Sequence, residues 1–243
     1  MTPMDVESID GVNVVRLNRP PVNALDFALV EDAVATMSTL QGPVVITGTG
    51  NCFSAGVDLR AVAQGGREYT DRFLDVMPSA FLAVFDYPWP VVAAINGHAI
   101  AGGCVVAMAA DVRLMSGGLI GLTEVAVGVP FPVAALEICR YAMGTTVSGA
   151  MLRAENIDAP TALARGWVDE VVAPDELLPR AIAMARALGQ NSPFAYAATK
   201  SQLHGPARAA IDAGGDIDPL VRTGWLSDET FARIEAFLRG LDR

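Results

Sequence analysis

The stretch that most constrains how this chain can fold runs from Val91 to Asp111 and reads VVAAINGHAIAGGCVVAMAAD. It opens with an apolar run of strand length, turns at Asn96-Gly97, and passes through Gly102-Gly103 into a second apolar run. The second run, from Cys104 to Ala110, is rich in alanine and contains neither proline nor glycine. The stretch therefore predicts a strand, a tight turn and a buried helix in direct succession.

The glycine pair at the start of this helix has two interpretations. Glycines let a ligand approach the backbone closely, and the first helical turn offers N–H groups with no partner inside the helix. The helix dipole favours negative charge there, so a phosphate or the oxyanion of a thioester enolate would fit. Tight packing of the helix on the strand explains the same glycines without a ligand, and this stretch alone does not decide between the two.

Composition excludes several classes of protein. Of the 243 residues, 52% are hydrophobic and 18% are charged, which suits a packed α/β protein with buried subunit contacts and argues against disorder. The net charge of −10 argues against nucleic acid or an anionic membrane as a partner. The longest apolar-or-glycine run, Ala99 to Ala110, is too short to span a bilayer, and the N-terminus lacks a signal-peptide pattern. We therefore expect a cytoplasmic protein with no membrane partner.

Cysteine and histidine usage gives no metal signal. Cys52, Cys104 and Cys139 are odd in number and widely spaced, and they fit no zinc pattern, so we expect reduced core cysteines. The two histidines, His98 and His204, are too few for a histidine-rich site. We expect no metal.

Strand and helix signals alternate through the first half of the chain. Val12–Leu17 and Val44–Thr47 have the β-branched composition of strands, and Asp26 can cap a helix that runs to about Leu40 between them. This order predicts parallel strands joined by crossover helices.

The segment Cys52–Arg60 is a second place where backbone N–H groups could converge. Gly56 can adopt a backbone conformation closed to other residues, and Asp58 can start the next helix. Within that helix region, Gln64–Arg67 is expected to be mobile. A stripe at helical spacing follows, which predicts a core face, with the wall of an acyl pocket as the alternative: Tyr69, Phe73, Met77 and Phe81.

Two glutamates are candidates for proton transfer. Glu124 follows a strand signal at Leu119–Leu122 and lies among apolar neighbours, where a carboxyl group either finds a partner or has its pKa raised towards a useful range. From position alone a partly exposed surface carboxylate is favoured, since most glutamates are solvated. Glu137 lies on a helix expected over Val133–Met143 and faces either the site or solvent, with solvent favoured.

From Gln190 onwards the pattern is helical only, with helices expected at about Pro193–Leu203, Arg208–Ala213 and Asp228–Leu241. The last helix has an apolar stripe, which predicts packing against a neighbouring subunit. Its members are Phe231, Ile234, Leu238 and Leu241.

Four ordered motifs make the chain resemble the crotonase superfamily, also called the enoyl-CoA hydratase/isomerase family, over nearly its whole length. They are Pro21–Leu25, Phe53–Leu59, Ala93–Cys104 and Gly166–Val172. The resemblance implies an α/β spiral of β-β-α units over residues 1–190, which binds acyl-CoA, and a helical trimerisation region over residues 191–243. It further implies a homotrimer or hexamer that acts on CoA thioesters in fatty acid metabolism, with CoA as part of the substrate and no separate cofactor.

The resemblance also implies site residues. The backbone N–H groups of Val57 and Gly102 match the family's oxyanion hole, which holds the thioester oxygen as negative charge develops. Arg60 matches a position near the CoA phosphates, although a solvated surface arginine is an alternative. The residues that match the CoA- and substrate-binding segments are Ala24, Leu25, Ala55, Gly56, Asp58, Leu59 and Arg60.

One departure from the family's pattern bears on the reaction. Hydratases of the family use two glutamates, because adding water requires a base for the water and an acid for the α-carbon. Glu124 matches one of them, but Val105 occupies the position of the other. A single carboxylate suffices to shift a double bond, so the chain most resembles the Δ3-Δ2-enoyl-CoA isomerase branch, with Glu124 as the base.

Two alternatives stay open at this point. The first is a hydratase, hydrolase, lyase or decarboxylase of the same family whose missing group comes from elsewhere, for example from Glu137. The second is a non-catalytic protein that binds acyl-CoA.

Overall fold

The computed structural model describes residues 3–214 and 218–241. The chain opens with an antiparallel pair, β1 (Met4–Ile9) and β2 (Val12–Leu17), of which only the second strand was predicted. Helix α1 (Phe27–Thr39) begins as predicted at Asp26, whose carboxylate accepts a hydrogen bond from the N–H of Leu29 at 3.0 Å.

Three successive units of two strands and one helix build the body of the molecule. They are β3 (Val44–Gly48), β4 (Cys52–Ser54) and α2 (Leu59–Phe85); β5 (Val91–Ile95), β6 (His98–Ile100) and α3 (Gly102–Ala109); and β7 (Val112–Met115), β8 (Leu119–Gly121) and α4 (Glu124–Val127). The first strand of each unit joins a six-stranded sheet of order β1-β2-β3-β5-β7-β10, and the second joins a four-stranded sheet of order β4-β6-β8-β9. The predicted α/β spiral of β-β-α units is thus confirmed.

The remaining elements surround this body. They are α5 (Val133–Met143), the 3₁₀ turn η1 (Gly144–Thr146), α6 (Val147–Arg153), β9 (Asn156–Asp158), α7 (Ala159–Ala164), β10 (Glu170–Val171), α8 (Pro174–Leu188), α9 (Pro193–Asp212), α10 (Asp218–Trp225) and α11 (Asp228–Leu241). Two helices were predicted where the structure has the single helix α9. This helix packs along α5 and continues through Pro206. Strand β9 was not predicted, since it is three residues long and depends on antiparallel pairing with β8.

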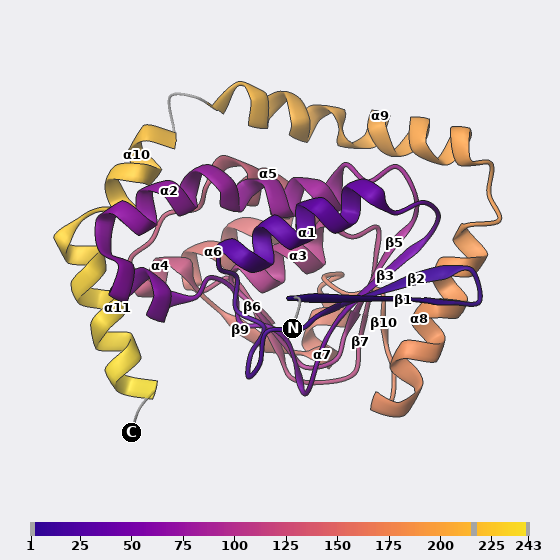
Figure 1. The fold of residues 1–243 in the computed structure, drawn as a ribbon, viewed down its shortest axis with the longest axis horizontal. Helices are drawn as coiled ribbons and strands as arrows, with labels where there is room; N and C mark the ends of the chain where they lie inside the picture. The colour runs from indigo at the N-terminus through magenta and orange to yellow at the C-terminus, as the bar shows by residue number, and fades with distance from the viewer. Residues whose placement is uncertain (1–2, 215–217, 242–243) are drawn as a thin grey trace.

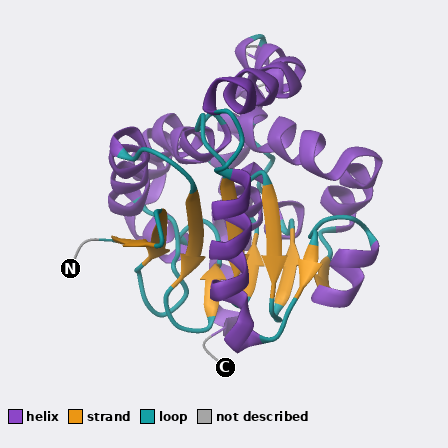
Figure 2. Cartoon of the chain, turned by 90° about the vertical axis from the view of Figure 1, so that its right-hand side faces the viewer, coloured by secondary structure: helices purple, strands orange, loops and turns teal. Residues whose placement is uncertain are grey.

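The central strands β3 and β5 of the large sheet are buried on both faces, which explains their mostly apolar sequences. Val45 and Val92 pack with Ala181 of α8 on one face, whereas Val44 and Val91 belong to the main core on the other. Figure 2 shows the strands at the centre of the molecule with helices around them.

The C-terminal helices pack on their own chain. Helix α9 lies along one side of the molecule over α5, and α10 and α11 lie at the end opposite α8 (Figure 1). In α11, Ile234 is fully buried against the core and Leu241 is 62% exposed. The expectation that a neighbouring subunit covers the stripe of this helix is therefore wrong for most of its length, because α2 and α4 of the same chain contact it.

The segment Gln64–Arg67 is helical, contrary to the expectation that it is mobile. It lies inside α2, where Gly66 introduces a kink with φ 65° and ψ −158°. Arg67 donates to the carbonyl oxygen of Leu226 at 2.9 Å and forms an ion pair with Asp228, so this turn is tied to the C-terminal helices. Within the described ranges, each helix is too short or too polar to cross a bilayer.

Candidate active site

A cavity of about 90 Å³ opens at the N-terminal end of α3, between α2, α4, α5 and the C-terminal helices. It is lined by Ala55, Val57, Leu59, Met77, Phe81, Ile100, Ala101, Gly102, Val105, Thr123, Glu124, Val127, Val129, Pro132, Ala135, Trp225 and Phe237. The loop after β4, the start of α3 and the start of α4 therefore meet in one place, as the predicted site requires.

The two glycine-containing segments touch through their backbones. Gly56 has φ +80°, a conformation that favours glycine, and a Cβ built on it would lie 2.8 Å from the backbone nitrogen of Gly102 and 2.8 Å from the carbonyl oxygen of Ile100. The ligand-free interpretation of the Gly102-Gly103 pair is also partly correct, because a Cβ on Gly103 would lie 2.2 Å from the carbonyl oxygen of Ser54.

Two residues next to this close approach, Val57 and Gly102, have backbone N–H groups that the local hydrogen bonds do not use. Leu25 and Val57 form a parallel bridge in which the N–H of Leu25 donates to Gly56 at 2.8 Å and the N–H of Asp58 donates to Leu25 at 2.9 Å. The N–H of Val57 has no partner in this bridge among the described residues. Gly102 is the first residue of α3, where the N–H has no acceptor within the helix. Both residues line the cavity.

Ala101, which precedes Gly102, has a strained backbone. Its φ of 52° and ψ of −123° are sparsely populated for any residue with a side chain. The residue is nevertheless held there by the hydrogen bond from its N–H to the carbonyl oxygen of Gly121 at 2.8 Å. Strain of this kind often accompanies a functional site, and here it sets the direction of the next N–H group.

Glu124 lies at the start of α4 with its side chain inside the cavity wall. The residue is 8% exposed, and its Oε2 atom is buried without a hydrogen-bond partner among the described residues. Burial raises the pKa of its carboxyl group to about 8, although the backbone N–H groups of Glu124 and Thr123 oppose the shift. A carboxyl group with this pKa can exchange protons near neutral pH.

The apolar surroundings of Glu124 come from elsewhere in the chain than its sequence neighbours suggested. Val125 is 45% exposed and contributes little, whereas Val105 of α3 and Phe81 of α2 share the cavity with Glu124. The stripe of α2 is a core face, as predicted, and part of it also borders the cavity. Phe73 is buried in the core, while Met77 and Phe81 also line the cavity.

Glu137 does not face solvent, which corrects the favoured expectation. It is 8% exposed, and its carboxylate forms an ion pair with Arg140 one helical turn away at 2.8 Å. It is not among the described residues that line the cavity with Glu124. The packing of α5 against α3 and α9 buries this face of the helix, which its own sequence periodicity did not show.

The residues predicted to bind CoA lie around the mouth of the site. Ala55 and Leu59 line the cavity, and Leu25 is buried beside Gly102. Asp58 caps α2 through the N–H of Ala61 at 3.0 Å, and its carboxylate also binds Arg19 at 3.0 Å, so this group has structural partners already. Ala24 is partly exposed and Arg60 is exposed.

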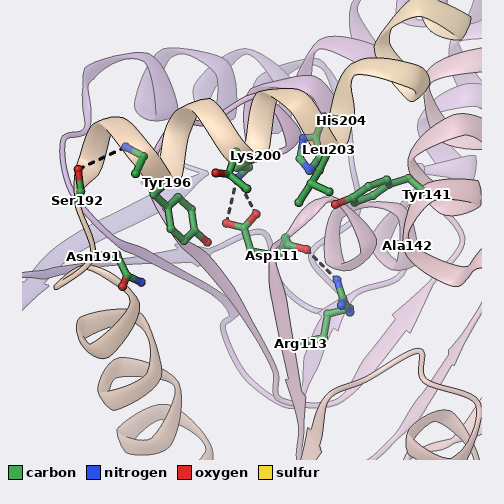
Figure 3. A pocket seen from close by; sticks show the side chains of 13 residues that line it. Asp111, Arg113, Tyr141, Ala142, Asn191, Ser192, Tyr196, Lys200, Leu203 and His204 are labelled. Atoms are coloured by element: carbon green, nitrogen blue, oxygen red, sulfur yellow. Dashed lines mark hydrogen bonds and ion pairs between the residues drawn. The ribbon is translucent and has the colours of Figure 1, made fainter.

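A larger cavity of about 710 Å³ lies away from this site, beneath α9 (Figure 3). Its charged groups are paired with each other, because the Lys200 ammonium binds the Asp111 carboxylate at 2.9 Å. Burial lowers the pKa of His204 to about 4, and its ring stacks on Phe85 at 3.7 Å. These contacts stabilise the packing of α9. Across residues 3–214 and 218–241, no cluster of three or more His, Cys, Asp or Glu side chains is arranged to hold a metal ion.

Comparison with known proteins decides the family. A family model described as enoyl-CoA hydratase/isomerase matches residues 7–228. The chain belongs to the enoyl-CoA hydratase/isomerase family. Among curated members of this family, a probable enoyl-CoA hydratase of Mycobacterium tuberculosis is 31% identical over 198 residues, which cover 79% of this chain and 76% of that protein.

Solved structures of the family agree with the fold. An enoyl-CoA isomerase of Mycobacterium tuberculosis is 32% identical with a TM-score of 0.80, and the match covers 88% of this chain and 96% of that one. The human mitochondrial delta3-delta2-enoyl-CoA isomerase has a TM-score of 0.92 over 99% of this chain and 98% of that one. At 24% identity the human structure is evidence for the fold alone. The chain is thus an enzyme with the crotonase fold, in a family whose members act on acyl-CoA thioesters.

Several lining residues were not predicted as part of the site, and two of them come from the C-terminal helices. Trp225 ends α10 and Phe237 lies in α11, a region that the sequence indicated only as an oligomerisation segment. No motif or spacing in the sequence connects them with Glu124, because their proximity depends on the way the C-terminal helices fold back over α2 and α4.

Proposed function

We propose that this enzyme shifts the double bond of a 3-enoyl-CoA to give the 2-enoyl-CoA, with Glu124 as the single proton carrier. The thioester oxygen would accept hydrogen bonds from the N–H groups of Val57 and Gly102. The acyl chain would lie in the cavity that these residues share with Glu124. CoA would enter as part of the substrate along the segments that contain Ala24, Leu25 and Ala55–Arg60, and the reaction would need no further cofactor.

The reaction balances with one carboxylate. The Glu124 carboxylate takes a proton from C2 of the substrate, and the electron pair moves into a dienolate whose negative oxygen faces the two N–H groups. The same carboxylic acid then returns the proton to C4, which leaves the double bond between C2 and C3. The loss of one oxyanion-hole donor costs other enzymes about 10²–10³ in rate, so these two N–H groups would supply much of the acceleration.

The observation that carries this proposal is the isolation of Glu124. Of the described residues that line the cavity, Glu124 alone has a carboxyl group, and Val105 faces the same space. Adding water to a double bond requires a second acid or base, and an apolar valine supplies neither. Glu137, the other buried glutamate of this region, is paired with Arg140 and does not line the cavity.

The test compares two substrates with the purified enzyme. We expect 3-hexenoyl-CoA to be converted to 2-hexenoyl-CoA, with little hydration of 2-hexenoyl-CoA to the 3-hydroxy product, as followed by chromatography of the CoA esters. Hydration with equal or better kcat/KM would support the second candidate, an enoyl-CoA hydratase, which the name of the mycobacterial relative favours. Tight acyl-CoA binding with no turnover of either ester would instead indicate a non-catalytic binding protein.

We further propose that the helical region, residues 191–243, assembles the protein in the cytoplasm as a homotrimer or a pair of trimers. Large apolar side chains on its surface support this, because Phe194 of α9 is 83% exposed and Leu220 of α10 is 72% exposed. Sedimentation of the purified protein tests the assembly, and a monomer at micromolar concentration would contradict it.

A further inference from the structure

Two aromatic side chains from the C-terminal helices, Trp225 of α10 and Phe237 of α11, line the cavity. They share it with Glu124 and with Met77 and Phe81 of α2. The proposed function places the reacting carbons beside Glu124, so the remote carbons of a short acyl chain would contact these two rings. The following inference about chain length rests on that proposed function.

Trp225 is held in place by the loop that follows Glu124. Its side chain is 2% exposed, and its indole Nε1–H donates to the carbonyl oxygen of Pro130 at 2.9 Å. Nearby, the hydroxyl of Thr230 donates to the carbonyl oxygen of Gly128 at 2.9 Å. Because both acceptors belong to the loop after α4, the aromatic wall and the segment that contains Glu124 are joined as one unit.

Helix α11 is anchored independently on α2. Arg67 donates to Leu226 at 2.9 Å, pairs with Asp228, and lies over the ring of Phe231 at 5.6 Å. Ile234 is completely buried three residues before Phe237. Widening the cavity on this side therefore requires moving a helix that is tied down at both its start and its middle.

The volume of the cavity bounds the acyl chain. A protein cavity of about 150 Å³ accommodates benzene. At the same density, 90 Å³ accommodates a chain of about four carbons. Val57, Gly102 and Glu124 line this same space, so the thioester carbon and the α-carbon take up part of it, and the cavity suits a short acyl group of about six carbons at most.

The chemistry of the walls restricts the acyl group further. Among the described lining residues none has a cationic side chain, and the indole N–H of Trp225 is already used by Pro130. A carboxylate at the far end of the acyl group would therefore be buried without a counter-charge, which is strongly unfavourable. The cavity suits an acyl chain that ends in a methyl group.

We infer that Trp225 and Phe237 determine acyl-chain length and restrict this enzyme to short, uncharged acyl thioesters of about six carbons. The wild-type enzyme is expected to convert 3-hexenoyl-CoA with a kcat/KM at least about tenfold higher than that for 3-dodecenoyl-CoA, which is the order of discrimination that a filled hydrophobic pocket gives. Hexanoyl-CoA should bind at least about tenfold more tightly than adipyl-CoA, which differs by a terminal carboxylate.

Phe237→Ala should widen the cavity and raise the ratio of dodecenoyl to hexenoyl activity by about tenfold or more. Phe237 is 45% exposed, so this variant is expected to fold. Trp225→Phe, which keeps an aromatic ring but loses the bond to Pro130, should raise the ratio to a smaller extent. Leu241→Ala is the matched control, since Leu241 lies on the same helix, is 62% exposed and is not among the cavity-lining residues.

Calorimetric titration with saturated acyl-CoA esters separates this inference from the proposed reaction, because it needs no turnover. If Phe237→Ala shifts the binding preference from hexanoyl-CoA towards dodecanoyl-CoA while neither enzyme isomerises a 3-enoyl-CoA, the length limit stands and the reaction proposed above fails. Wild-type preference for the dodecanoyl or dodecenoyl ester would overturn the inference, as would equal preferences in Phe237→Ala and Leu241→Ala.

Discussion

A Cβ atom on Gly56 would lie 2.8 Å from the backbone nitrogen of Gly102. Two loops that are separated by nearly a whole β-β-α unit thereby bring Val57 and Gly102 to the wall of a single cavity. The positive φ of Gly56 and the strained backbone of Ala101 both serve this approach. Each of the predictions below depends on this arrangement or on the carboxyl group that faces it.

Gly56→Ala should reduce kcat by about 10²–10³, the cost of losing an oxyanion-hole donor, because the added methyl group forces the two backbone segments apart. Gly11→Ala is the matched control, since Gly11 has φ +78° but nothing within 4 Å of the added Cβ. Both variants should lose some thermal stability, but only the first should lose activity. Equal kcat values in the two variants would show that this close approach does not matter for the reaction.

Glu124→Gln should abolish isomerisation, with a fall in kcat of about 10² or more, because an amide cannot accept the α-proton. Binding of hexanoyl-CoA should remain within a few-fold of wild type, since the side chain keeps its shape. Glu137→Gln should keep near-wild-type activity, because Glu137 is buried to the same extent but does not line the cavity. Loss of activity in Glu137→Gln would favour a two-carboxylate reaction over the one proposed.

The rate should depend on pH through Glu124. Only the carboxylate accepts a proton, and burial raises the pKa of this group to about 8. The kcat/KM for a 3-enoyl-CoA should therefore rise by about tenfold per pH unit below this pKa and become constant above it. The profile is measured with stopped assays. The pH range is the one in which circular dichroism shows that the enzyme is folded. A profile that is already flat at neutral pH would mean that the carboxyl group is ionised there and that the cavity is wetter than its walls indicate.

The same group should make the folded state less stable as pH rises. The pKa of Glu124 is raised from 4.5 to about 8 by burial, so between these values the folded protein holds a proton that the unfolded chain has released. The free energy of unfolding then falls by up to about 1.4 kcal/mol per pH unit in this window from this group alone. Glu124→Gln does not titrate, so its melting temperature minus that of wild type should grow across the window and level off above it. A constant difference would contradict the burial of a titrating carboxyl group.

Local signals in the sequence were sufficient for much of the architecture. Asp26 and Asp58 cap the helices that were predicted to start there, and the central strands β3 and β5 are mostly apolar because both of their faces are buried. These features depend on neighbours within a few residues or on a burial pattern with a fixed period. They could be predicted without knowing where the rest of the chain lies.

Contacts between distant segments could not be predicted in this way. The environment of Glu124 comes from Phe81, Val105 and Trp225, whereas its sequence neighbour Val125 is exposed. The short strand β9 and the buried position of Glu137 also depend on partners that the local sequence does not identify.

The sequence by itself therefore determined the family, the β-β-α order and the presence of one carboxyl group next to two glycine loops. The tertiary structure decided that this carboxyl group is buried, with no partner for Oε2 among the described residues, and that Trp225 and Phe237 line the same cavity. The physical reason is that backbone conformation and helix capping are local properties, whereas desolvation and cavity volume are set by every atom that surrounds a point in space.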